Sequence, residues 1–243
     1  MSGTKFLRCC SLVLVVASTA AASAGTRPAV VELYTSQGCS SCPPADALLG
    51  ELSGRPDVLA LSFHVDYWDK LGWRDRFSLP AAGERQFNYV RHFGQDWVYT
   101  PDIVIDGHTD VLRVDRQELL RKVSGRRDGV PLHVAVEGEN LVINVGAARD
   151  AAVSAVVLIG YQPKAVTAIG QGENAGRELH EFNVVRSFAT LGSWQGSANE
   201  WRVSLRSLPA DATRVAVLVQ QLGPGPIVGA ASLALPPSTL QSP

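Results

Sequence analysis

The sequence has few cysteines, little excess charge and no long apolar segment after its first residues, and each shortage excludes a class of protein. Four cysteines among 243 residues are too few for a scaffold held together by disulfides. A formal net charge of −1 provides no basic surface for nucleic acid or an anionic membrane. Beyond residue 24 no apolar segment reaches the length that a membrane span needs. We therefore expect a soluble protein that does not bind nucleic acid.

The first residues have the three parts of a secretory signal peptide. Lys5 and Arg8 supply positive charge, residues 10–17 are apolar, and residues 22–24 read Ala-Ser-Ala, which is a small-residue cleavage site. We therefore expect residues 1–24 to be removed and the mature protein to be periplasmic or secreted.

Cleavage would leave one close pair of cysteines. Cys9 and Cys10 leave with the signal peptide, and Cys39 and Cys42 remain. So short a loop makes a poor structural staple, because closing it restrains the unfolded chain little. A tetrahedral zinc site needs four ligands, and no second cysteine pair exists to complete one. An oxidising compartment together with one tight pair favours redox chemistry.

The pair lies between an expected strand and an expected helix. Residues 29–35 form a β-branched apolar run, and an apolar pattern at helical spacing follows Cys42. A helix N-terminus favours a thiolate, so Cys39, on the loop side, is the expected attacking sulfur and Cys42 the resolving one. No cation lies in residues 35–46, which predicts only mild activation. Two prolines follow Cys42, so the helix either begins there or is kinked.

The next segments alternate between strands and helices. The patterns predict a strand over 57–65, an insertion over about 66–95 that ends in a helix over 81–93, a strand from Pro101 to the turn at 106–107, and a helix over 116–124. A proline at a strand start, as at Thr100-Pro101, is a plausible place for a cis peptide bond.

From about residue 129 the sequence alternates in the manner of β-strands. We expect a hairpin of residues 132–137 and 141–145, further strands at 153–161, 200–205, 214–220 and 227–235, and a mobile hairpin tip at 170–176. These strands predict a small antiparallel sandwich, followed by a disordered tail at 236–243.

The order of these elements resembles a thioredoxin fold. More narrowly, residues 32–46 and 64–68 resemble a secreted thioredoxin-like family catalogued as a domain of unknown function, and residues 183–186 and 223–227 extend the likeness. The resemblance implies an α/β fold class: a thioredoxin-like domain at 27–128 followed by a β-rich domain at 129–235.

The resemblance also implies roles for single residues. Pro101 takes the place of the cis-proline that faces the cysteines, and the Thr100 backbone would pair with a bound peptide. Glu32 would be the buried acid that moves protons for the resolving cysteine, although it lies one position too far from the cysteines unless the strand bulges. Independently of the resemblance, the aromatic residues of the insertion, Tyr67, Trp68 and Trp73, would line a groove near the cysteines or simply pack the insertion.

The function expected from these residues is thiol–disulfide exchange with protein or small-molecule thiols and disulfides. It needs no cofactor beyond the redox-active Cys39–Cys42 disulfide. Two alternatives stay open. One is copper(I) binding by Cys39, Cys42 and His64, with Asp66 and His92 as further candidate ligands, because soft thiolates select copper(I). The other is a non-catalytic binding module in which the disulfide only holds a loop.

Overall fold

The computed structural model of the chain describes residues 25–111 and 115–237. The expected signal peptide at 1–24 and most of the expected tail, residues 238–243, lie outside the described residues. The helices are α1 (Pro43–Ser53), α2 (Pro80–His92), α3 (Arg116–Val123) and a short 3-10 helix, η1 (Leu205–Ser207). The strands are β1 (Gly25–Arg27), β2 (Ala29–Thr35), β3 (Val58–His64), β4 (Asp102–Ile105), β5 (Thr109–Val111), β6 (Arg127–Gly129), β7 (Leu132–Glu137), β8 (Asn140–Val145), β9 (Ser154–Ala168), β10 (Glu178–Trp194), β11 (Asn199–Ser204), β12 (Arg214–Gln221) and β13 (Ile227–Ala234).

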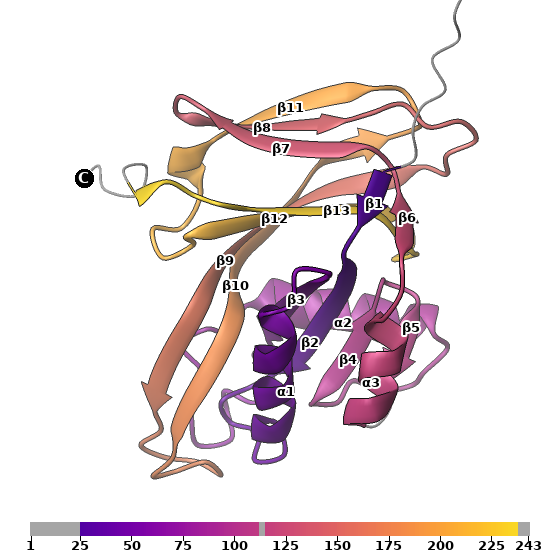
Figure 1. The fold of residues 1–243 in the computed structure, drawn as a ribbon. Helices are drawn as coiled ribbons and strands as arrows, with labels where there is room; N and C mark the ends of the chain where they lie inside the picture. The colour runs from indigo at the N-terminus through magenta and orange to yellow at the C-terminus, as the bar shows by residue number, and fades with distance from the viewer. Residues whose placement is uncertain (1–24, 112–114, 238–243) are drawn as a thin grey trace, which may run out of the picture.

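One mixed sheet of eight strands runs through the molecule in the order β13-β12-β9-β10-β3-β2-β4-β5. Strand β3 is parallel to both of its neighbours, β2 and β10, and the other pairs are antiparallel. Three further strands form a small sheet in the order β11-β8-β7, and β1 pairs with β6. Figure 1 shows β9 and β10 as a long hairpin that descends from the upper strands to the side of α1 and β3.

The expected fold class, an α/β thioredoxin-like domain followed by a β-rich domain, is wrong. Strand is the commonest element in the described residues, and strands from both halves of the chain form one mixed sheet. The physical reason lies in β9 and β10, which are 15 and 17 residues long. Both strands are too long for the small sandwich that the sequence predicts. Strand β10 also pairs with β3, in the first half of the chain, through Val184 and Ser62.

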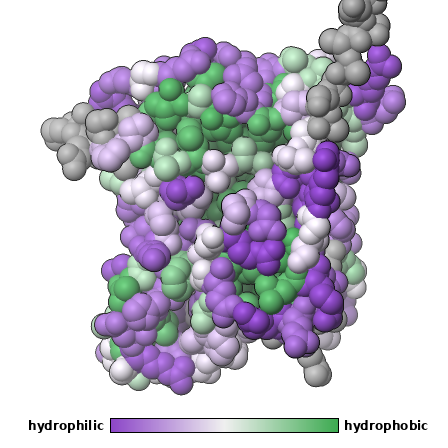
Figure 2. Space-filling model, viewed as in Figure 1, coloured by the Kyte–Doolittle hydropathy of each residue, from purple (hydrophilic) through white to green (hydrophobic). Residues whose placement is uncertain are grey.

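Helices and the small sheet cover the two faces of the main sheet. Helix α2 packs on one face, where Ala82 and Tyr89 join a core with residues of β2, β3, β9 and β12. Helices α1 and α3 cover β2, β3 and β4 on the opposite face. The three-stranded sheet packs against β9 and β12 in a third core. Figure 2 shows hydrophobic residues gathered in the upper part of the molecule, where the small sheet lies in Figure 1.

Several local expectations are confirmed. The strand ending at Thr35, the strand ending at His64 and the hairpin of β7 and β8 form as the patterns predict. The helix expected at 81–93 is α2 and the one expected at 116–124 is α3. No helix in residues 25–111 and 115–237 has both the length and the apolarity that crossing a membrane would need.

Candidate functional site

The two cysteines form a disulfide at the junction between β2 and α1. Their Cα atoms lie 5.4 Å apart, and Cys42 is the N-cap of α1. The prolines occupy the first helical positions, so the helix begins at Pro43 and is not kinked there. Leucines of α1 pack against Val31 and Leu33 of β2, which fixes the end of the helix that carries the pair. Both cysteines are fully buried, with 0% of each residue exposed.

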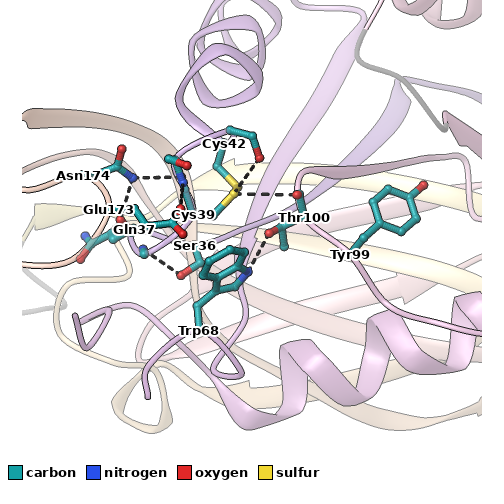
Figure 3. The surroundings of a disulfide bond; sticks show 12 residues. Ser36, Gln37, Cys39, Cys42, Trp68, Tyr99, Thr100, Glu173 and Asn174 are labelled. Atoms are coloured by element: carbon teal, nitrogen blue, oxygen red, sulfur yellow. Dashed lines mark hydrogen bonds between the residues drawn. A yellow bond between two sulfur atoms is a disulfide. The ribbon is translucent and has the colours of Figure 1, made fainter. Parts of the chain in front are cut away.

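The Thr100–Pro101 segment lies directly against the pair. The peptide bond is cis, as expected. The Sγ atom of Cys39 lies 3.8 Å from the carbonyl oxygen of Thr100 and 3.3 Å from the Ser41 hydroxyl. Figure 3 shows the Thr100 carbonyl pointing at the sulfur atoms. The structure therefore brings Cys39, Cys42, Thr100 and Pro101 together, as the sequence predicts.

Trp68 closes one side of the pair. Its indole Nε1 donates to the Thr100 hydroxyl at 2.8 Å, and its Cβ lies close to Gly38, where an added Cβ would be 3.3 Å away. Tyr67 lies one step further out. It is 37% exposed, and its hydroxyl donates to Gln86, whose amide in turn donates to the carbonyl oxygen of Tyr99. Trp68 thus contacts the site, and Tyr67 supports the segment that precedes Thr100.

The turn between β9 and β10 closes another side. The side-chain amide of Asn174 donates to the carbonyl oxygens of Gln37 and Cys39, and the carboxylate of Glu173 accepts from the Ser40 amide. Figure 3 shows both side chains on the opposite side of the loop from Thr100. Residues more than 130 positions away in the sequence therefore hold the cysteine loop.

A buried ion pair lies at the carboxyl end of β3. His64 Nδ1 is 2.7 Å from Asp75 Oδ2, and the Gln37 amide donates to the same oxygen at 2.8 Å. Burial lowers the pKa of His64, but the Asp75 carboxylate outweighs it, so the pKa is raised overall. Burial raises the pKa of Asp75, and the charge of His64 outweighs it, so that pKa is lowered. Both shifts favour the charged forms of the pair.

Two further carboxyl groups face this ion pair. Burial raises the pKa of Asp46, in the first turn of α1, to about 7, against the opposing charge of His64. Burial also raises the pKa of Glu181 on β10, whose carboxylate accepts from Gln37 and Thr167. The cysteine loop thus rests on a cluster of polar groups on the α1 side of the sheet.

Glu32 lies on the other face of the sheet. Its carboxylate accepts from Arg85 Nε at 2.7 Å and from the Tyr89 hydroxyl at 2.6 Å, and both residues belong to α2. No bulge interrupts β2, where residues 29–35 pair with β3 without a shift. The structure therefore does not bring Glu32 to the cysteines, and Asp46 is the carboxyl group nearest to them along α1.

A cleft of about 590 Å³ opens between α1 and the Thr100 segment. Ala45 and Leu48 line it from the helix, and Tyr99, Thr100 and Pro101 line it from the opposite side. Ser41, between the two cysteines, reaches the same cleft. A partner molecule in this cleft would lie beside the disulfide and against the Thr100 backbone.

The candidate copper ligands other than the cysteines are not gathered at the pair. His64 is turned to Asp75, and His92 lies exposed in the last turn of α2 beside Phe93. Within the described part of the chain, no group of three histidine, cysteine, aspartate or glutamate residues has the arrangement of a metal site.

Sequence reasoning found Thr100, Pro101 and Trp68 but missed four other residues near the pair. Asp46 had a readable signal, because it follows Cys42 by four residues and so lies on the same face of the helix. Asp75, Glu181 and Asn174 had none, since long-range folding alone brings them to the loop.

Comparison with known proteins places the chain in a family. Residues 30–220 match the family described as protein of unknown function DUF1223. The crystal structure of a protein from Agrobacterium tumefaciens, a structural-genomics target, is similar with 30% identity and a TM-score of 0.72, over 87% of this chain and 96% of that one. HBP35 of Porphyromonas gingivalis is similar with 14% identity and a TM-score of 0.57, over 86% of this chain and 76% of that one, a likeness that shows the fold alone. No curated protein matches the chain. Because the family match and the 30%-identical structure each extend over most of its length, this chain belongs to the family described as protein of unknown function DUF1223.

Proposed function

We propose that this protein carries out thiol–disulfide exchange outside the cytoplasm, with Cys39 as the exchanging sulfur and Cys42 as the resolving one. The observation that supports the proposal most is the Cys39–Cys42 disulfide beside the Thr100 carbonyl and an open cleft. A disulfide that only held a loop would need no cleft against it. The signal-like sequence at residues 1–24 supports an oxidising compartment.

The exchange balances as a two-electron transfer. A substrate thiolate attacks Cys39 Sγ, the bond between the two sulfurs breaks, and its electron pair stays on Cys42, which takes up a proton. A second substrate thiolate then attacks the substrate sulfur of the mixed disulfide and releases Cys39. The protein disulfide and two substrate thiols become a protein dithiol and one substrate disulfide. In the reverse direction, a Cys39 thiolate attacks a substrate disulfide and Cys42 resolves the intermediate.

Both sulfurs are buried, so the reaction requires an opening. Trp68 lies on one side of the pair, donates a hydrogen bond to the Thr100 hydroxyl and packs against the core on the α2 side. Movement of this indole is the opening that the proposal requires. It would cost the hydrogen bond, about 1 kcal/mol, and part of that packing. In the cleft an extended substrate could pair with the free edge of the Thr100 backbone.

The test is a redox titration of the wild-type protein with trapping of mixed disulfides. The protein is equilibrated with dithiothreitol buffers, quenched by alkylation and weighed by mass spectrometry. The Cys42→Ser protein is incubated with a mixture of disulfide substrates, which its Cys39 thiolate attacks with release of a substrate thiolate. We expect a reversible two-electron transition and a mixed disulfide on Cys39 alone. A pair that stays oxidised at every ratio of dithiothreitol, in folded protein, would refute the proposal.

Two variants separate the proposal from the alternatives. The double change Cys39→Ser and Cys42→Ser should abolish exchange while the protein stays folded. Full biological function of that double variant would instead support a binding module. Tight copper(I) binding by the reduced protein, lost in Cys39→Ser, would support metal delivery.

A further inference from the structure

The turn between β9 and β10, residues 169–177, is called here the hairpin tip. It is closed by backbone hydrogen bonds from the Ile169 amide to the Arg177 carbonyl and from the Gly176 amide to the Ile169 carbonyl. Gly172 and Gly176 adopt positive φ values of 77° and 79°, which the turn requires and glycine supplies at little cost. The tip is therefore a defined structure with its own internal bonds.

Asn174 in the hairpin tip uses its whole side chain to bind the cysteine loop. Its Nδ2 donates to the carbonyl oxygens of Gln37 at 3.0 Å and Cys39 at 2.9 Å. Its Oδ1 accepts from Arg177 at 3.1 Å, which fixes the orientation of the amide. The residue is 1% exposed, so loss of these bonds would leave buried carbonyl groups unpaired.

Glu173 binds the next residue of the same loop. Its Oε2 accepts from the Ser40 amide at 3.1 Å, and its pKa is lowered by these hydrogen bonds with Ser40. The carboxylate is therefore ionised near neutral pH and stands beside the residue that follows Cys39.

Trp73 anchors the hairpin tip in this place. An added Cβ on Gly172 would lie 3.0 Å from Trp73 Cβ, so the tip backbone touches the tryptophan directly. The indole Nε1 of Trp73 donates to the side chain of Gln37 at 3.0 Å. The contact between the tip and the cysteine loop is thus supported from a second side.

These contacts change the surroundings of a Cys39 thiolate. A helix N-terminus normally stabilises a thiolate through its free N–H groups, but Pro43 and Pro44 have none. The Cys42 amide donates to the Cys39 carbonyl at 3.3 Å, and the Ser40 amide donates to Glu173. These backbone amides are therefore absent or engaged, which leaves the Ser41 hydroxyl, 3.3 Å from Cys39 Sγ, as the donor beside the sulfur. Glu173 adds a negative charge nearby.

We propose that the hairpin tip sets the reactivity of Cys39, with Glu173 and Asn174 as positioning residues. Asn174 holds residues 37–39 in the shape of the closed disulfide, and Glu173 competes with a Cys39 thiolate for the Ser40 amide. The inference rests on the proposed exchange reaction. In that reaction the tip favours the oxidised pair, and a reductant must loosen the tip from the loop to form the dithiol.

The first experiment varies Glu173 in the reduced protein without residues 1–24 and measures the Cys39 pKa from the pH dependence of alkylation at Cys39, followed on its peptide by mass spectrometry. Glu173→Gln removes the negative charge but keeps an oxygen that can accept from the Ser40 amide. Glu173→Ala removes both the charge and the acceptor, which frees the Ser40 amide. We expect the Cys39 pKa to fall from wild type to Glu173→Gln and again to Glu173→Ala, by less than about one in each step, with smaller steps at high salt.

Glu178→Gln is the matched control. Glu178 lies at the start of β10 and pairs with His180 on an exposed surface, so the variant removes the same charge from the same hairpin. It should leave the Cys39 pKa at the wild-type value. Equal pKa values in wild type, Glu173→Gln and Glu173→Ala would overturn the proposal, as would an equal change in the control.

The second experiment removes the clamp with Asn174→Ala and measures the rate of disulfide reduction by dithiothreitol. Two lost hydrogen bonds should raise the rate up to about tenfold, and the equilibrium should shift towards the dithiol. Asn174→Asp tests the same point without creating a cavity. Its carboxylate cannot donate to the carbonyl oxygens of Gln37 and Cys39, so the hairpin tip should come loose from the cysteine loop. Both variants reducing at the wild-type rate, in folded protein, would overturn the proposal.

The two proposals fail in different ways. A wild-type pair that dithiothreitol reduces, together with a Cys42→Ser protein that forms no mixed disulfide with any substrate, would refute the exchange function. The Cys39 pKa values and reduction rates would still report whether the hairpin tip acts on the pair.

Discussion

Asp46→Asn is the change whose effect on stability can be worked out most fully. Asp46 lies in the first turn of α1, four residues after Cys42, and faces the His64–Asp75 ion pair and Thr35. Burial raises its pKa from 3.8 to about 7. The folded protein therefore holds a proton on Asp46 between about pH 4 and pH 7 that the unfolded chain has released.

The sign follows from proton linkage. Where the folded state binds more protons than the unfolded state, the free energy of unfolding falls as pH rises. Burial of Asp46 therefore lowers the free energy of unfolding little near pH 4 and most above pH 7. A pKa difference of about 3 corresponds to roughly 4 kcal/mol as an upper bound. Because Asp46 keeps part of its surface in solvent, we expect about half of that bound, or roughly 2 kcal/mol.

The assay is urea unfolding of oxidised wild type and Asp46→Asn at several values between pH 4 and pH 8. Asparagine has the shape of the protonated acid, so the two proteins should have equal stability near pH 4. The variant should become more stable by roughly 2 kcal/mol at pH 8, with the change centred between pH 5 and pH 7. Groups that do not interact with Asp46 titrate alike in both proteins and cancel in the difference, whereas His64 loses the effect of the Asp46 charge in the variant. A difference that does not depend on pH would refute the raised pKa and the burial that causes it.

Three further substitutions test other parts of the structure. Glu32→Gln leaves its arginine partner on α2 buried without a counter-charge and should lower the free energy of unfolding in urea by about 3–5 kcal/mol, while the Cys39 pKa stays unchanged. A changed Cys39 pKa with little loss of stability would contradict the position of Glu32 on the α2 face of the sheet. Gly107→Ala should destabilise by more than about 1 kcal/mol in the same assay, because φ is +73° and the added Cβ would lie 2.5 Å from a carbonyl oxygen of the turn before β13. Trp68→Phe keeps a ring but loses the bond to Thr100, so dithiothreitol should reduce the pair severalfold faster. The exposed Trp97→Phe should reduce at the wild-type rate, and equal rates in both variants would count against Trp68 as the cover.

The local pattern of the sequence predicts the elements that carry the cysteines. The apolar run of β2, the helical spacing after Cys42 and the proline before β4 each depend on residues close in sequence, and each forms where the pattern places it. The position of Glu32 shows the limit of this reasoning. Alternation along a strand decides which face a side chain takes, and without a bulge Glu32 must face α2.

Strand β10 is the element that sequence reasoning missed, and with it the overall fold class. Its residues mix charged, polar and apolar side chains, because parts of it are exposed and parts are buried. Apolar and polar residues therefore do not alternate regularly along it, and the pattern does not indicate a strand. Only the pairing of Val184 with Ser62 shows that this strand completes the sheet of the first half. Long-range pairing of this kind leaves no local signal.

The candidate site needs both halves of the chain. Strand β2, α1 and the Thr100 segment supply the two sulfurs and the cleft, and the hairpin tip supplies the groups that hold the cysteine loop. If the first half worked alone, the contacts of Glu173 and Asn174 would be replaceable by solvent, since water can satisfy the same carbonyl and amide groups. The burial of Asn174 and of both cysteines argues against that, because water does not reach these groups in the closed form. The family match from residue 30 to residue 220 contains every one of these elements. The cysteine pair and the hairpin tip therefore belong to one fold and contact each other, and the reactivity that we propose for the sulfurs should be measured in protein that contains both halves.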